Sequence, residues 1–72
     1  MERGTLARMT NNGQFLVLTD GRVLEVDCRD VTTALLWPPS TPLEISKMDD
    51  DPVYDLRVRG PGDGEGIRAC WS

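Results

Sequence analysis

The sequence predicts a small all-β barrel of five or six short antiparallel strands, and three observations support this fold class. Apolar and polar residues alternate with a period of two along several short segments, which is typical of strands with one buried face. Asn-Gly and Asp-Gly pairs separate the first of these segments and favour the positive φ angles of tight hairpins. No segment shows the period of an amphipathic helix. Closure into a barrel would also remove the exposed edges of a flat sheet.

The first half of the chain is predicted to form a three-stranded meander, with strands over residues 5–9, 14–19 and 22–26. The turns between these strands are Asn11-Asn12-Gly13 and Asp20-Gly21. The third strand shows the alternation most clearly, because Leu24 and Val26 are followed in each case by an acidic residue. We therefore expect these two apolar side chains in the core and the carboxylates, including that of Asp27, in water.

Longer connections interrupt the alternation in the second half of the chain. Residues 27–33 are mostly polar, and they predict a single helical turn that begins near Asp30. Residues 34–37 are then expected to return to the core in an extended conformation. Pro38, Pro39 and Pro42 have no N–H to donate to a sheet, so they predict a corner or an edge at this point.

The remaining strands are predicted over residues 43–47, 53–59 and 67–71. Their inward side chains are expected to be Leu43, Ile45, Tyr54, Leu56, Val58, Ile67, Ala69 and Trp71. Residues 60–66 contain four glycines and are expected to form a flexible loop. Residues 1–72 are therefore predicted to form a single β-barrel domain, without a linker or a second domain.

The composition argues against an enzyme. The chain has 72 residues, of which 12 are acidic and 8 are basic, and it contains no His, the commonest general base and metal ligand. The acidic residues 49–51 with Asp55 lack the glycine of a calcium loop. Residues 60–66 contain anions that would repel a phosphate group. We therefore expect no catalytic, cofactor-binding or metal-binding residues.

Two cysteines, Cys28 and Cys70, leave two interpretations open. They are either reduced thiols, as in a cytoplasmic protein, or a disulfide in a periplasmic protein whose signal peptide has been removed. Residues 1–8 carry three charges and no apolar run, unlike a signal peptide. The longest apolar runs have four residues, too few to span a membrane. We therefore expect a soluble, cytoplasmic protein without a membrane partner.

Trp37, Pro38, Pro39 and Tyr54 form the candidate interaction patch. If the indole of Trp37 is exposed beside the two prolines, the patch would bind a peptide or a second subunit. The alternative, favoured by the small size of the core, is that Trp37 and Trp71 both pack inside the fold. The expected partner is an unidentified protein, and the chain is expected to be a monomer or a weak homodimer.

Arg57, Arg59 and Arg68 lie at outward positions of two adjacent predicted strands, where they would form a basic stripe. Small barrels bind single-stranded nucleic acid through basic and aromatic residues. Asp55 on the same face and a net charge of −4 oppose such binding, so a solvated face with cross-strand ion pairs is favoured. The function predicted from these residues is a non-catalytic interaction or structural module. A barrel that binds single-stranded nucleic acid is the alternative, and a small enzyme or enzyme accessory comes third.

Several short motifs occur along the chain in the same order as in a known group of domains, which the chain therefore resembles. The motifs are DGRVLEVD at residues 20–27, Asp30, Trp37-Pro38, DPVYDL at residues 51–56 and GEGIRA at residues 64–69. In this order they resemble small bacterial domains of unknown function with an SH3-like β-barrel. The resemblance covers residues 12–69, and it departs from the pattern at Leu24, where an aromatic residue is common, and at Pro39 and Gly66. It implies an SH3-like barrel without catalytic or cofactor residues, and it implies export of some relatives, so the disulfide stays open.

Overall fold

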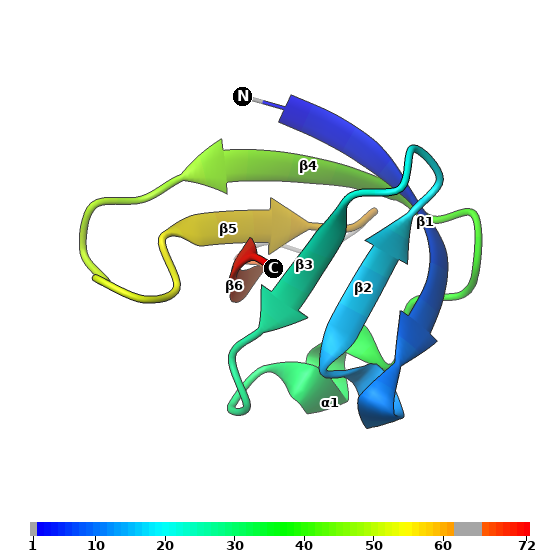
Figure 1. Cartoon of the computed structure of the whole chain (residues 1–72), viewed down its shortest axis with the longest axis horizontal. Helices are drawn as coiled ribbons and strands as arrows, with labels where there is room; N and C mark the ends of the chain where they lie inside the picture. The colour runs from blue at the N-terminus through cyan, green and yellow to red at the C-terminus, as the bar shows by residue number, and fades with distance from the viewer. Residues whose placement is uncertain (1, 62–65) are drawn as a thin grey trace.

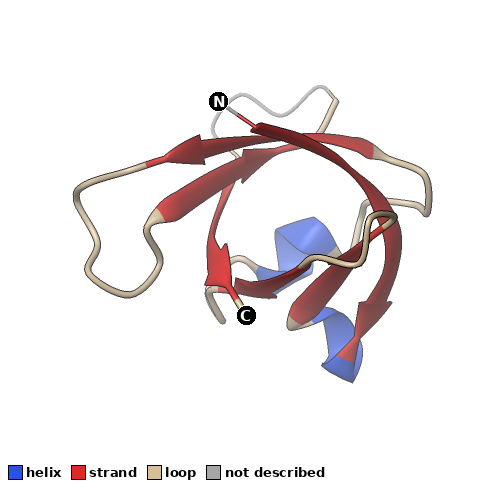
Figure 2. Ribbon diagram, turned by 45° about the horizontal axis from the view of Figure 1, so that its top comes forward, coloured by secondary structure: helices blue, strands red, loops and turns tan. Residues whose placement is uncertain are grey.

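The computed structural model describes residues 2–61 and 66–72, which form a closed barrel of six antiparallel strands (Figure 1, Figure 2). The strands are β1 (Glu2–Thr10), β2 (Phe15–Leu18), β3 (Val23–Val26), β4 (Pro42–Lys47), β5 (Leu56–Arg59) and β6 (Ile67–Trp71). Two short helical segments complete the described structure, the 3-10 turn η1 (Asn11–Gly13) and α1 (Val31–Ala34). The predicted fold class is confirmed, because this is a small all-β barrel of short antiparallel strands.

The barrel consists of two three-stranded meanders that close on each other. β1, β2 and β3 pair in sequence order, as do β4, β5 and β6. Pairing of β1 with β4 and of β3 with β6 then joins the meanders along both sides. Figure 1 shows α1 and η1 together at one end of the barrel, and the connection from β4 to β5 extending to one side. We call the end that carries α1 the capped end.

The core confirms much of the predicted alternation. Leu24 and Val26 of β3 are 0% and 1% exposed, and Leu43 and Ile45 of β4 are 1% and 2% exposed. The buried apolar side chains are Leu6, Leu16, Leu18, Leu24, Val26, Ala34, Trp37, Leu43, Ile45, Leu56, Val58, Ile67 and Ala69. All six strands contribute to this set, so removal of any one strand would open the core to water.

The turn between β1 and β2 has the positive φ angles that its sequence predicts. Asn11, Asn12 and Gly13 have φ values of 54°, 58° and 92°, and together they form η1. Gly13 is buried, and a Cβ atom at this position would lie 2.7 Å from a side-chain carbon of Leu35. The turn therefore packs against the segment after α1 and forms part of the capped end.

The prediction for residues 34–37 is wrong. The segment is not an extended strand-like piece, because Ala34 ends α1 and a turn follows. Ala34 and Trp37 are buried, whereas Leu35 and Leu36 are 51% and 79% exposed. The helical turn that begins after Asp30 sets this spacing, since a helix directs residues three apart, and not two apart, to one side.

The prediction that Trp71 is packed in the core is wrong. Its Cα atom pairs with that of Leu24, so Trp71 does lie on the inward side of β6. It is nevertheless 41% exposed, because it lies at the open end of the barrel, where it lines a hollow of about 270 Å³. The guanidinium carbon of Arg22 lies 5.0 Å from the centre of the indole ring, which is within the range of a cation–π contact.

Two further predictions from strand alternation change at the ends of strands, and one loop prediction falls partly outside the described residues. Asp27 was expected in water but is 2% exposed, because β3 ends at Val26 and the chain turns there. Tyr54 was expected inside a strand over residues 53–59, but β5 is shorter and Tyr54 is half-buried in the connection before it. The expected flexible loop at residues 60–66 falls partly on residues 62–65, which lie outside the described residues.

Candidate functional site

Trp37 forms the floor of the capped end and is not an exposed contact residue. Its side chain is 8% exposed, and its backbone N–H donates a hydrogen bond of 3.0 Å to the carbonyl of Ala34. A Cβ atom on Gly60 would lie 2.7 Å from Nε1 and 2.8 Å from Cε2 of the indole. The ring therefore lies directly against the backbone that follows β5, and the core-packing interpretation of Trp37 is correct.

The exposed part of the predicted patch is an apolar groove above Trp37. It has a volume of about 420 Å³ and combines the connection after α1 with the residue that follows Gly60. Its walls are exposed prolines, and Leu36 projects beside them with 79% of its surface in water. We call this hollow the cap groove; its lining residues are Leu36, Trp37, Pro38, Pro39, Ser40, Thr41, Pro42 and Pro61.

Hydrogen bonds to β1 hold the proline-containing connection in place. The backbone N–H of Ser40 donates to the carbonyl of Leu6 at 2.7 Å, and the N–H of Leu6 donates to the carbonyl of Thr41 at 2.9 Å. The hydroxyl of Thr41, which is 6% exposed, donates to the carbonyl of Pro38. Ser40 adopts a φ of 71°, which turns the chain between the two bonds. The cap groove is thus part of the barrel framework and not a loose loop.

Tyr54 does not line the cap groove, so the structure divides the predicted patch. Its hydroxyl donates a long hydrogen bond of 3.5 Å to the Glu25 carboxylate, and its backbone N–H donates to Asp51 at 2.9 Å. Burial, followed by the nearby Glu25 charge, raises the pKa of the Tyr54 phenol. Tyr54 therefore belongs to the outer surface over β3, away from the prolines.

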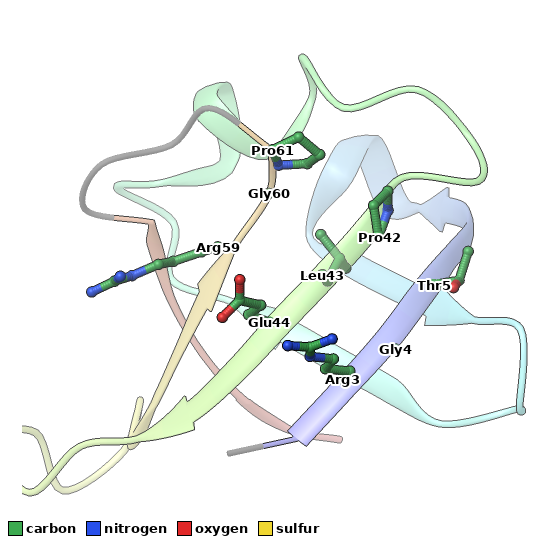
Figure 3. Close-up of a pocket in the computed structure, with 9 residues that line it drawn as sticks. All are labelled: Arg3, Gly4, Thr5, Pro42, Leu43, Glu44, Arg59, Gly60 and Pro61. Carbon is green, nitrogen blue, oxygen red and sulfur yellow. The ribbon is translucent and has the colours of Figure 1, made fainter.

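A second hollow continues from the cap groove along the outer face of the barrel. It has a volume of about 540 Å³ and shares Pro42 and Pro61 with the cap groove (Figure 3). Arg3 of β1 and Arg59 of β5 flank Glu44 of β4, since each is a Cα partner of Glu44. Figure 3 shows Arg59 extending away from Glu44. We call this the arginine hollow.

The predicted basic stripe exists, but carboxylates interrupt it. Arg57 and Arg68 are Cα partners on β5 and β6, so their side chains lie on one outer face. Arg68 forms ion pairs of 3.5 Å with Asp50 and 3.6 Å with Asp51, both from the connection between β4 and β5. Arg57 donates to the sulfur of Met48 at 3.2 Å. The acidic connection thus reduces the positive potential of the stripe at its β6 side.

Sequence reasoning missed a cluster at the end of β3. The Asp27 carboxylate accepts hydrogen bonds from Arg29, including one of 2.6 Å from Nη2 and one of 3.0 Å from the backbone N–H. The Arg29 side chain and then its backbone N–H lower the pKa of Asp27 to about 2. Asp30 accepts the backbone N–H of Arg68 at 3.0 Å, which ties the start of α1 to β6. The Asp-x-Arg spacing is the only signal in the sequence that could have indicated this cluster.

The two cysteines are not bridged. Cys28 is exposed, and Cys70 on β6 is partly buried. Burial, followed by the charges of Glu25 and Asp55, raises the pKa of the Cys70 thiol. The structure thus places free thiols where the sequence left a disulfide open.

Comparison with known proteins gives no family for this chain. No family model matches it, and neither a curated protein nor a solved structure matches it. Within residues 2–61 and 66–72, no group of three or more His, Cys, Asp or Glu side chains is placed to hold a metal ion. No helix in the same residues is long and apolar enough to cross a membrane. The resemblance to SH3-like domains of unknown function stays a prediction.

Proposed function

We propose that this protein is a non-catalytic protein-interaction module that binds its partner through the cap groove and the adjacent Leu36 side chain. One observation carries the proposal. Leu36 exposes 79% of its surface beside a groove of about 420 Å³ whose exposed rim is formed largely by prolines. An exposed apolar patch of this kind is typical of a contact surface.

The rigidity of the groove supports the same function. Two backbone hydrogen bonds to Leu6 fix the segment that carries the prolines, and the buried Trp37 supports it from below. A contact surface that is already ordered loses little conformational entropy on binding, so more of the contact energy remains as affinity. An exposed leucine on a mobile loop would give no such advantage.

Binding of single-stranded nucleic acid is the second candidate, and the pairing of Arg57 with Arg68 on adjacent strands is what favours it. The Asp50 and Asp51 carboxylates beside Arg68 oppose it, as does the formal net charge of −4. The interaction module therefore remains the better supported function.

The test is affinity capture from the native host with three tagged chains, the wild type, Leu36→Glu and Val53→Glu. Val53 is a matched control, because it is also an exposed apolar residue, at 60%, but lies in the connection before β5. We expect a reproducible protein in the wild-type and Val53→Glu captures that is lost with Leu36→Glu. A partner retained equally by all three chains would contradict the proposal, as would enrichment of nucleic acid alone.

A further inference from the structure

Three surface hollows follow one another along the outer face of β4 and β5. The cap groove and the arginine hollow share Pro42 and Pro61. The arginine hollow shares Arg59 with a third hollow of about 590 Å³, which also contains Ser46 and Arg57. Because each hollow shares lining residues with the next, we describe the three together as one track, which we call the β4–β5 track.

The chemistry of the β4–β5 track changes along its length. Its first part is apolar, with Leu36 and prolines. Its middle part carries Arg3 and Arg59 beside the Glu44 carboxylate, and its far part carries Arg57 and Arg59 beside the Asp49 and Asp50 carboxylates. None of these three arginines forms an ion pair with another described residue, whereas Arg22, Arg29 and Arg68 each do. Within the arginine hollow two arginines therefore stand against one carboxylate, on a protein whose formal net charge is −4.

We propose that the β4–β5 track binds an extended peptide segment of a partner protein, with apolar or proline residues in the cap groove followed by an acidic residue at Arg59. The proposal rests on the proposed function and specifies its ligand. The six residues of β4 span roughly 20 Å at about 3.3 Å per residue, so a segment of about seven residues would run along β4, and a segment that also enters the cap groove would be longer.

Charge complementarity selects this occupant. A carboxylate near Arg59 would gain a charge-assisted hydrogen bond that Glu44 does not provide in the structure, since Arg59 extends away from it (Figure 3). A second copy of this chain is disfavoured by repulsion between two molecules of net charge −4. An oligonucleotide would meet the Asp49 and Asp50 carboxylates at the far end of the track.

The test uses a phage-displayed library of random eight-residue peptides, selected against the immobilised full chain. We expect the enriched sequences to combine leucine or proline with at least one Asp or Glu. Selection against Arg59→Glu is expected to replace the acidic residue by Lys or Arg. A synthetic copy of the wild-type consensus should bind Arg59→Glu about tenfold more weakly by fluorescence anisotropy, and it should bind Val53→Glu as it binds the wild type.

Each of the other outcomes would overturn the peptide ligand, and each shows whether the proposed interaction function fails with it. Peptides that depend on Leu36 but have no acidic preference, or an unchanged consensus with Arg59→Glu, would refute the acidic ligand and leave the interaction function in place. No enrichment above the Leu36→Glu chain would refute a peptide ligand. In that case a dimer in sedimentation that Leu36→Glu dissociates would identify a second copy as the occupant. Loss of both peptide enrichment and captured partner would refute the proposed function as well.

Discussion

Replacement of Gly60 by alanine is expected to destabilise the barrel, because the added methyl group would clash with the indole ring of Trp37. The added Cβ atom would lie 2.7 Å from Nε1, 2.8 Å from Cε2 and 3.2 Å from Cζ2 of the indole. Carbon atoms in contact ordinarily lie about 3.5–4.0 Å apart. The indole or the backbone after β5 must therefore move, and Trp37 is 8% exposed in a close-packed environment that leaves little room for movement.

Overpacking of this kind costs about 1–3 kcal/mol. A chain of 72 residues has a total stability of about 4–11 kcal/mol, so the loss is a large fraction of it. At roughly 4–8 °C per kcal/mol, a loss of about 2 kcal/mol lowers the melting temperature by roughly 8–16 °C. Both values are measurable by circular dichroism during thermal and urea unfolding.

A double-mutant cycle with Trp37→Phe tests the cause. Phenylalanine has no counterpart of Cζ2, and its smaller ring can move away from position 60, so Gly60→Ala should cost about 1 kcal/mol less in that background. An unchanged free energy of unfolding in Gly60→Ala would contradict a clash with Trp37. An equal cost in both backgrounds would contradict it as well, because the strain would then lie in the backbone and not against Trp37.

Three further predictions follow from the charged and thiol groups. The folded-state pKa of Asp27, about 2, lies below its ordinary value of 3.8, so its stabilising contribution is complete above pH 3.8 and is lost as the pH falls through 2. Asp27→Asn should accordingly flatten the fall in urea midpoint between pH 4 and pH 2. Arg22→Ala should lower the free energy of unfolding by about 1 kcal/mol, because it removes half-exposed ion pairs and a cation–π contact, and Arg22→Lys should recover only part of the loss. In the folded protein Ellman's reagent should modify Cys28 faster than Cys70, and both should react in denaturant without reductant; a single reactive thiol or none would contradict the free-thiol assignment.

Strand alternation predicted the buried residues at the centres of β3, β4, β5 and β6, because a pleated strand places every second side chain on one face. Leu24 and Ile45 are buried as that rule requires. The rule fails at strand ends, where the backbone leaves the sheet. Asp27 becomes buried because Arg29 turns back onto its carboxylate, and Trp71 becomes exposed because the barrel ends beneath its ring.

The candidate site was predicted only in part, for a related reason. Residues 34–37 are all apolar, and no polar residue alternates with them, so the sequence could not show which of their side chains face water. The structure buries Trp37 and exposes Leu36. Pro38 and Pro39 lie in a turn, as predicted, whereas Pro42 is already the first residue of β4. Tyr54 was grouped with these prolines by residue type alone and does not line the cap groove. Arg59 could not be separated from Arg68 without knowledge of the acidic connection that pairs with one and not the other.

Two adjacent residues at the capped end are expected to separate binding from stability. Trp37 is 8% exposed, so Trp37→Ala should cost about 3–5 kcal/mol and leave the chain close to unfolding. Leu36 is 79% exposed, so Leu36→Glu should change the free energy of unfolding by less than about 0.5 kcal/mol while it abolishes partner capture. Urea unfolding and affinity capture on the same preparations measure both effects. If Leu36→Glu lost partner and stability together, the loss of binding would reflect unfolding, and the cap groove would no longer be supported as the contact surface.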